Sequence, residues 1–155
     1  EVIGVKLQEI DAVDSVVTPS AAEASGVNDR LQLSLAEAEM RRRTNEALLR
    51  SGVTMVDPSS TFVDTTVRVG RDVTLFPGVM LQGSTVVGDG SELGPNTRLV
   101  DCTVGANSVV EQTSARRAAI GNEAHVGPYA HLAPGTEVAS GTTTGPFYNS
   151  AAATA

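Results

Sequence analysis

Two histidines are among the side chains of this sequence that could most readily do chemistry. His125 and His131 lie six residues apart, and imidazole nitrogens can bind Zn²⁺ or act as general bases. A zinc site shared between repeated units would need a third histidine, and the sequence has only two. We therefore expect both histidines to be polar surface positions at equivalent edges of adjacent strands.

The single cysteine, Cys102, is a second candidate, because a thiolate can act as a nucleophile. Neither histidine lies near it in the sequence pattern, so we expect a small core residue rather than a catalytic thiol. One cysteine also excludes an internal disulfide and fits a reducing compartment.

Two short basic runs could bind phosphate. Arg41–Arg43 falls in a helical segment, where we expect a solvated face or ion pairs with Glu37, Glu39 or Glu46. Arg116–Arg117 falls in an interruption of the repeats described next, and nothing else in the sequence supports a phosphate site there.

A six-residue repeat must position most of these side chains. Aliphatic residues recur at this spacing at Val63, Val69, Leu75, Leu81, Val87, Leu93 and Leu99. A small or β-branched residue stands two positions before each, at Thr61, Val67, Val73, Val79, Thr85, Ser91 and Thr97. The period slips by one at Val104, resumes at Val110, is interrupted over Glu111–Ala118, and runs again from Ile120 through Val126, Leu132 and Val138 to Thr144.

Hexads of this kind predict short strands that alternate with turns and stack in parallel, which is a single-stranded parallel β-helix. The aromatic content of 3% fits thin layers with one aliphatic side chain per strand. A β-sandwich would instead repeat its strands at about 8–12 residues. The expected fold is therefore mainly β, with one long α-helix before it.

The helix is expected over Asn28–Gly52, with Asn28 as its N-cap and Gly52 as its C-terminal stop. Leu31, Leu35 and Ala38 would share one face, with Leu48 and Leu49 near the end. The predicted organisation is an irregular or linker segment at 1–25, a linker helix at 26–54, a β-helix at 55–145 with a loop at 111–118, and a frayed tail at 146–155.

Charge and hydropathy exclude several classes of partner. The net charge is −7 and the pI is near 4.7, which argues against nucleic acid. The N-terminus shows no basic region followed by an apolar run, so we expect no signal peptide. The apolar runs are too short for a membrane helix.

Three segments, in order, resemble a known family. They are "GVNDRLQL", the run from "RSGVTMVDP" to "DCTVG", and "IGNEAHVGPYAHLAPGTEV". Over roughly residues 26–145 they are similar to the bacterial bifunctional N-acetylglucosamine-1-phosphate uridyltransferase/glucosamine-1-phosphate acetyltransferase, often called GlmU. The resemblance implies a linker helix and the first part of a C-terminal left-handed β-helix domain.

The resemblance also implies a function and an assembly. The family makes UDP-N-acetylglucosamine for peptidoglycan and lipopolysaccharide in the cytoplasm, as a homotrimer. It uses acetyl-CoA and glucosamine 1-phosphate in the β-helix domain, and UTP with Mg²⁺ in an N-terminal domain. By resemblance, Asn28 matches an asparagine that binds Mg²⁺ and the uridyl substrate, since a neutral oxygen can complete an octahedral Mg²⁺ shell. By itself, Asn28 is expected to be a helix cap.

The sequence departs from the family pattern at several positions. The family's N-terminal domain is missing, "EVIGV" and "GVN" stand apart in the sequence, and Lys6–Val27 has no counterpart that we recognise. The family arginine that grips the sugar phosphate is replaced by Ala133, and Ser150, Ala151 and Ala152 stand near the place of its lysines. The general-base histidine would lie beyond the last residue.

We therefore expect no catalytic residue, and no cofactor bound to this chain alone. The first hypothesis is that the chain is part of the bifunctional transferase and is inactive by itself. The alternative is a non-catalytic β-helical module for trimerisation or scaffolding. We expect no nucleic-acid or membrane partner in either case.

Overall fold

The computed structural model describes residues 26–150, and it divides into a unit that ends at Ala36 and a unit that begins at Glu37. The irregular segment predicted at 1–25 and the last five tail residues lie outside the described part. One helix, α1 (Arg30–Arg50), precedes a short 3₁₀ turn, η2 (Pro58–Ser60), and fifteen short strands. The strands are β1 Thr54–Met55, β2 Phe62–Val63, β3 Arg68–Val69, β4 Thr74–Leu75, β5 Met80–Gln82, β6 Val86–Val87, β7 Glu92–Leu93, β8 Arg98–Val100, β9 Thr103–Val104, β10 Val109–Val110, β11 Ser114–Arg116, β12 Ala119–Ile120, β13 His125–Val126, β14 His131–Leu132 and β15 Glu137–Val138.

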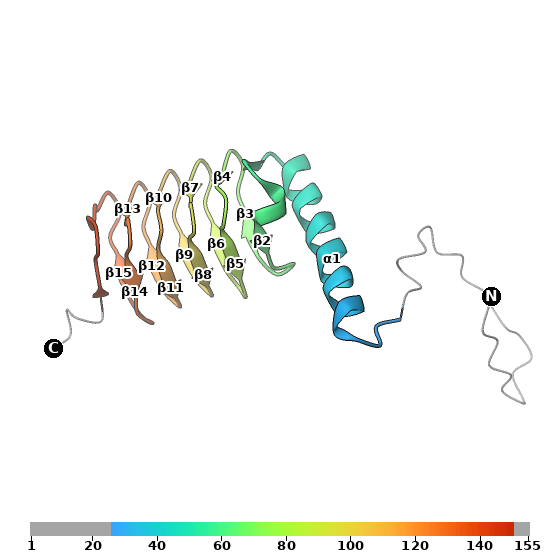
Figure 1. Cartoon of the computed structure of the whole chain (residues 1–155). Helices are drawn as coiled ribbons and strands as arrows, with labels where there is room; N and C mark the ends of the chain where they lie inside the picture. The colour runs from blue at the N-terminus through green and yellow to red at the C-terminus, as the bar shows by residue number, and fades with distance from the viewer. Residues whose placement is uncertain (1–25, 151–155) are drawn as a thin grey trace, which may run out of the picture. The chain divides into compact units, whose positions relative to one another are not determined.

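Every third strand pairs in parallel, so the strands form three five-stranded sheets. Their orders are β1-β4-β7-β10-β13, β2-β5-β8-β11-β14 and β3-β6-β9-β12-β15. Each coil thus contributes one strand to each face of a left-handed parallel β-helix (Figure 1). The predicted fold class is confirmed.

The interior is filled by one side chain per strand. The second residue of most strands points inward, and Leu75, Leu93 and Leu99 have no exposed surface. The register of the ladders stacks these residues in three columns. The columns are Met55, Leu75, Leu93, Val110, Val126; Val63, Leu81, Leu99, Ala115, Leu132; and Val69, Val87, Val104, Ile120, Val138.

The residues that precede most strands are buried at the corners, and where they are serine or threonine their hydroxyls are hydrogen-bonded. Ser108 is an example: its Oγ donates to the carbonyl of Gly121 at 2.8 Å and accepts from the amide of Ala124 at 3.3 Å. Thr85 Oγ1 likewise donates to the carbonyl of Gln82 and accepts from the amide of Cys102. A buried hydroxyl therefore joins neighbouring coils without leaving an unmet polar group.

The loop predicted at 111–118 is wrong, because strand β11 lies within it and pairs with β8 and β14. Ala115 is buried in the interior column where an aliphatic residue was expected. Two successive steps of five residues, from Val110 to Ala115 and from Ala115 to Ile120, replace the usual steps of six. Alanine at the inward position and the shorter steps hid this strand from the pattern.

The described part of the tail that was predicted to fray, residues 146–150, is hydrogen-bonded to the preceding coil. Asn149 forms a parallel bridge with His131, and Thr143 forms one with His125. Ser150 Oγ accepts from the Ala133 amide at 2.8 Å. The repeat register therefore continues for one partial coil beyond Thr144, with Tyr148 packed against the core.

The helix ends differ in how well they were predicted. Asp29 caps the N-terminus in place of Asn28, because Asp29 Oδ1 accepts from the Gln32 amide at 2.7 Å. At the other end Gly52 has φ of 103°, and the amide of Val53 donates to the carbonyl of Leu48, as in a Schellman motif. The predicted glycine stop is confirmed.

The leucines expected to share one face of the helix are exposed in its first half. Leu31 and Leu35 are 69% and 62% exposed, and the one fully buried side chain of the described helix is Asn45. Asn45 Nδ2 donates to the carbonyls of Pro58 and Thr61, at 2.9 and 3.0 Å. A polar contact with η2 therefore joins the second half of α1 to the first coil, which a hydrophobic pattern cannot reveal.

A column of glycines lies where each coil passes from its third strand to the next coil. A Cβ on Gly88 would stand 2.6 Å from the Ala106 amide nitrogen, and one on Gly105 would stand 2.5 Å from that of Asn122. The backbones of successive coils approach too closely here for any side chain.

Candidate functional site

Asn28, the predicted uridyl and Mg²⁺ ligand, lies just before α1 in the first unit. It is exposed, and its backbone amide donates to Gln32 Oε1 at 2.6 Å. Within residues 26–150, no three histidine, cysteine, aspartate or glutamate side chains gather in a group that could hold a metal ion. A role for Asn28 would therefore depend on ligands from elsewhere in a larger protein, and it stays a prediction.

Ala133, the position at which the resemblance implies a phosphate-binding arginine, follows strand β14 and is half-buried. Its carbonyl accepts from the Thr136 amide at 3.1 Å and from Thr136 Oγ1 at 2.6 Å. Thr136 Oγ1 also lies 2.7 Å from Ser150 Oγ. The turn is thus held in place by hydroxyl groups, while the side chain at its first position is a methyl group.

The two histidines lie on the outside of the β-helix, as the sequence predicts. They do not stack, because β13 and β14 belong to different sheets. His125 Nε2 lies 3.1 Å from Glu111 Oε2, a residue of the preceding coil. This carboxylate partner was missed, since Glu111 falls in the segment interpreted as a loop.

An exposed aromatic pair lies close to these residues. The rings of Tyr129 and Phe147 stack with centroids 5.2 Å apart, and Gln112 Nε2 donates to the Tyr129 hydroxyl at 3.2 Å. All three residues have positive φ and repeat at one corner of successive coils. The six-residue pattern of inward residues carries no signal for this outward column.

Cys102 is buried at a corner, and its Sγ lies 3.3 Å from the carbonyl oxygen of Val100. Burial raises the pKa of this thiol, which disfavours the reactive thiolate. The predicted core role is confirmed.

Arg42 and Arg43 of α1 form ion pairs, as one of the two predicted alternatives requires. Arg42 binds Glu39 at 2.8 Å and Glu46 at 3.0 Å, and Arg43 binds Glu39 at 2.7 Å. Hydrogen bonds from Arg42 and then Arg43 lower the pKa of Glu39 from 4.5 to about 2. Arg116, the last residue of β11, and Arg117 are both exposed.

We expect Glu39 to keep its charge far into the acid range. Because its folded pKa is below its unfolded value, the stability that it contributes is present above pH 4.5 and is lost as the pH falls towards 2. A carbon-detected NMR titration of the Glu39 carboxyl should show this midpoint, and Arg42→Gln should raise it towards 4.5. A midpoint near 4.5 in the unsubstituted chain would contradict the ion-pair geometry.

No helix among the described residues is both long and apolar enough to cross a bilayer. The stacked coils, the inward aliphatic columns and the tight glycine corners together define a hexapeptide-repeat β-helix protein.

Within this class, the comparisons with known proteins identify the family. The chain is 50% identical over 109 residues to the bifunctional protein GlmU of Thermobifida fusca. This alignment covers 70% of this chain and 22% of the relative. The chain is 42% identical over 124 residues to the bifunctional protein GlmU of Corynebacterium efficiens. That alignment covers 80% of this chain and 26% of the relative. The chain belongs to the GlmU family, as its sequence predicts, and it spans about a quarter of the length of these relatives.

No protein-family model matches the chain. Among solved structures, PerB from Caulobacter crescentus in complex with CoA and GDP-perosamine aligns with a TM-score of 0.46 and 13% identity, over 70% of this chain and 63% of that one. A likeness at this level supports no comparison of individual residues.

Proposed function

We propose that residues 26–150 are the linker helix and the first coils of the acetyltransferase β-helix of a GlmU-type bifunctional transferase. The observation that carries this proposal is the identity of 42–50% to GlmU proteins along a segment that contains both a helix and a β-helix. The whole protein would acetylate glucosamine 1-phosphate with acetyl-CoA and then transfer uridyl from UTP. Its products would serve peptidoglycan and lipopolysaccharide synthesis in the cytoplasm.

The acetyl transfer defines what the β-helix must supply. The amine nitrogen of glucosamine 1-phosphate attacks the thioester carbonyl carbon of acetyl-CoA, the CoA thiolate leaves, and a general base takes the proton from the nitrogen. The sugar phosphate must be held during this step, and an arginine fork is well suited to hold it. Ala133 places a methyl group at the corresponding turn. We therefore propose that this chain alone does not catalyse the transfer.

Uridyl transfer would need Mg²⁺, for which Asn28 is the one candidate ligand in this segment. Its neutral oxygen would complete a shell built mainly from carboxylate and phosphate oxygens. Those ligands would come from other parts of the whole protein.

The acetyltransferase proposal has a direct assay. The 155-residue chain is mixed with acetyl-CoA and glucosamine 1-phosphate, and free CoA is followed with a thiol reagent. We expect no release above background, and Ala133→Arg alone should not produce it. A complete GlmU from Corynebacterium efficiens is the positive control. Sugar-dependent CoA release by the unsubstituted chain would refute the proposed inactivity.

A second candidate function is a trimeric scaffold without catalysis, which the loss of the arginine at Ala133 favours. Phe62, Met80 and Val86 are 38%, 38% and 41% exposed on the outer faces of the β-helix, where another copy could cover them. Light scattering should give three times the chain mass. A monomer at micromolar concentration would contradict the trimer.

A further inference from the structure

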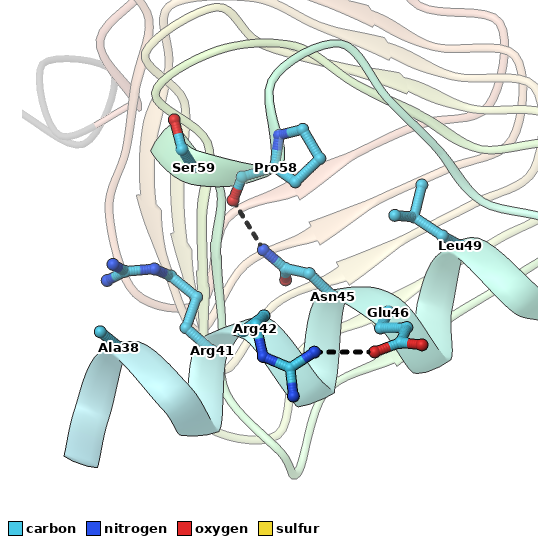
Figure 2. A pocket seen from close by; sticks show the side chains of 8 residues that line it. All are labelled: Ala38, Arg41, Arg42, Asn45, Glu46, Leu49, Pro58 and Ser59. Carbon is cyan, nitrogen blue, oxygen red and sulfur yellow. Dashed lines mark hydrogen bonds and ion pairs between the residues drawn. The ribbon is translucent and has the colours of Figure 1, made fainter. Parts of the chain in front are cut away.

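The sheet β3-β6-β9-β12-β15 carries one column of exposed side chains on its outer face. The first residue of each strand points outward, and the ladder register sets these residues side by side. The chain's own helix does not cover the column, because α1 packs on η2, where Asn45 donates to the Pro58 carbonyl (Figure 2). We name the column face C, and all five of its residues are exposed. In order along the β-helix they are Arg68, Val86, Thr103, Ala119 and Glu137.

The charges of face C lie at its two ends and have opposite signs. Arg68 is the cation at one end, and Glu137 is the carboxylate at the other. Neither side chain is in an ion pair among residues 26–150. Four strand spacings separate them by about 19 Å, which is too far for the two to pair within one copy. Each charge is therefore available to a partner from outside.

The middle of face C is uncharged and low. Val86 is 41% exposed, and the residues on either side of the centre have short side chains. Gly88, Gly105 and Gly121 border the column along one edge, so no side chain rises beside it there. Two sheets pack face to face at about 10 Å, and such a flat surface allows this approach. Covering Val86 would also remove apolar surface from water.

The order of the residues makes face C complementary to itself in one orientation only. When the β-helix of a second copy runs in the opposite direction, Arg68 of each copy meets Glu137 of the other. Val86 then meets Ala119, and Thr103 meets Thr103 at the centre. Two copies that run in the same direction would place like charges against each other at both ends, which is unfavourable. An antiparallel contact is isologous, so it closes after two copies.

The rim next to strands β8 and β11 holds charges of both signs. Asp101 of each copy would lie near the two-fold axis there. Hydrogen bonds from Ser84, and then the charges of Arg116 and Arg117, hold the pKa of Asp101 below its usual value. These arginines outnumber the carboxylate, so this rim carries no net negative charge.

The opposite rim brings no two carboxylates together. Asp89 begins this corner, and its Oδ1 accepts from the Arg71 amide of the preceding coil at 2.8 Å. In the antiparallel pair Asp89 stands opposite Asn122, which is neutral. Glu123 lies one position further round the corner, away from face C.

We propose that face C is an interface between two copies of this chain, which pack with their β-helices antiparallel about a two-fold axis at Thr103. Five outward residues a side are far fewer than the about 20–30 of a standard interface. The dissociation constant is therefore on the order of 0.1–1 mM, and most copies are single at micromolar concentration. The contact involves neither Ala133 nor Asn28, so it does not depend on the proposed transferase function.

Cysteine trapping tests the orientation of the pair. A bis-methanethiosulfonate reagent with a short spacer is added to the full chain at 0.2 mM, since facing strands are too far apart for a direct disulfide. Thr103→Cys should link to its own copy and give twice the chain mass on a non-reducing gel. Ala119→Cys alone should stay single, but it should link when it is mixed with Val86→Cys. The unsubstituted chain, whose Cys102 is buried, is the control for the reagent.

Charge reversal tests the two end contacts. In the Thr103→Cys chain, Arg68→Glu should lower the yield of the linked pair about tenfold, because each ion pair becomes a repulsion. Adding Glu137→Arg to that variant exchanges the two charges and should restore the yield. Arg98→Glu, on the outer face of β8 in another sheet, makes the same change in net charge and should leave the yield unchanged. Circular dichroism checks that each variant is folded.

Three results would overturn the proposal. A yield for Thr103→Cys no higher than that of the unsubstituted chain would mean that the copies do not meet at face C. Self-linkage of Ala119→Cys would show copies that run in the same direction. Slow maleimide labelling of Thr103→Cys without a linked pair would place another segment of the same chain on face C.

Discussion

Replacing Gly105 with alanine should destabilise the β-helix by about 3 kcal/mol. The new Cβ would stand 2.5 Å from the Asn122 amide nitrogen and 2.6 Å from the Gly121 carbonyl carbon, and both belong to backbone that the ladder of the next coil holds in place. Glycine to alanine ordinarily stabilises a chain by about 0.4–1 kcal/mol, because it restricts the unfolded state. The close approach therefore reverses the usual sign.

Urea unfolding followed by circular dichroism measures this effect. Ala139 supplies the control, since it occupies the same corner one coil after Gly121 and is exposed. Ala139→Val should change the free energy of unfolding by no more than about 0.5 kcal/mol. An unchanged or raised midpoint for Gly105→Ala would show that the coils are further apart than described.

Replacing Leu99 with alanine should cost about 4 kcal/mol, near the upper end for a buried leucine. Leu99 has no exposed surface and lies in its column between Leu81 and Ala115. Ala115 is too small to fill the new space, and the ladders on both sides of β8 limit backbone collapse. The cavity should therefore stay open.

Met80→Ala is the matched control for this substitution, because Met80 projects from the outer face of β5 in the same sheet and is 38% exposed. It should cost about 1 kcal/mol or less. Equal losses in the two variants, at unchanged denaturant m-value, would contradict the assignment of inward and outward faces.

The sequence predicts the fold well where each strand carries its own signal. An aliphatic residue every six positions is enough to identify strands such as β5 and β8, because the parallel ladder imposes the same inward position on each coil. Gly52 is equally local: it lies directly after the helix and adopts a conformation that favours glycine.

The prediction failed where a residue's role depends on a distant neighbour. Ala115 is an interior residue only because the strands on either side of it hold β11 in place. Asn45 is buried where its side chain donates to carbonyls thirteen and sixteen positions away. Leu31 is exposed although the spacing of the leucines favours burial. Asp29 rather than Asn28 caps α1, because adjacent residues of similar type compete for one role.

The candidate site was predicted in part. The surface positions of the histidines and the core position of Cys102 follow from their register. The aromatic pair and the Glu111–His125 contact depend on which residues from successive coils meet at one corner. The steps of five residues between Val110 and Ile120 set the alignment of Glu111 with His125, whereas Tyr129 and Phe147 lie the regular eighteen positions apart.

Those shortened steps have a consequence for how such a chain can change in length. Arg68 pairs with Val86, eighteen positions later, yet Thr103 pairs with Ala119, only sixteen positions later, and in both cases the partners lie at the same place on one face. A residue lost at a corner is absorbed within its own coil, whereas one lost inside a strand would turn an inward side chain outward. Lineages of this fold can therefore gain and lose single residues at the corners while the columns of the core stay aligned.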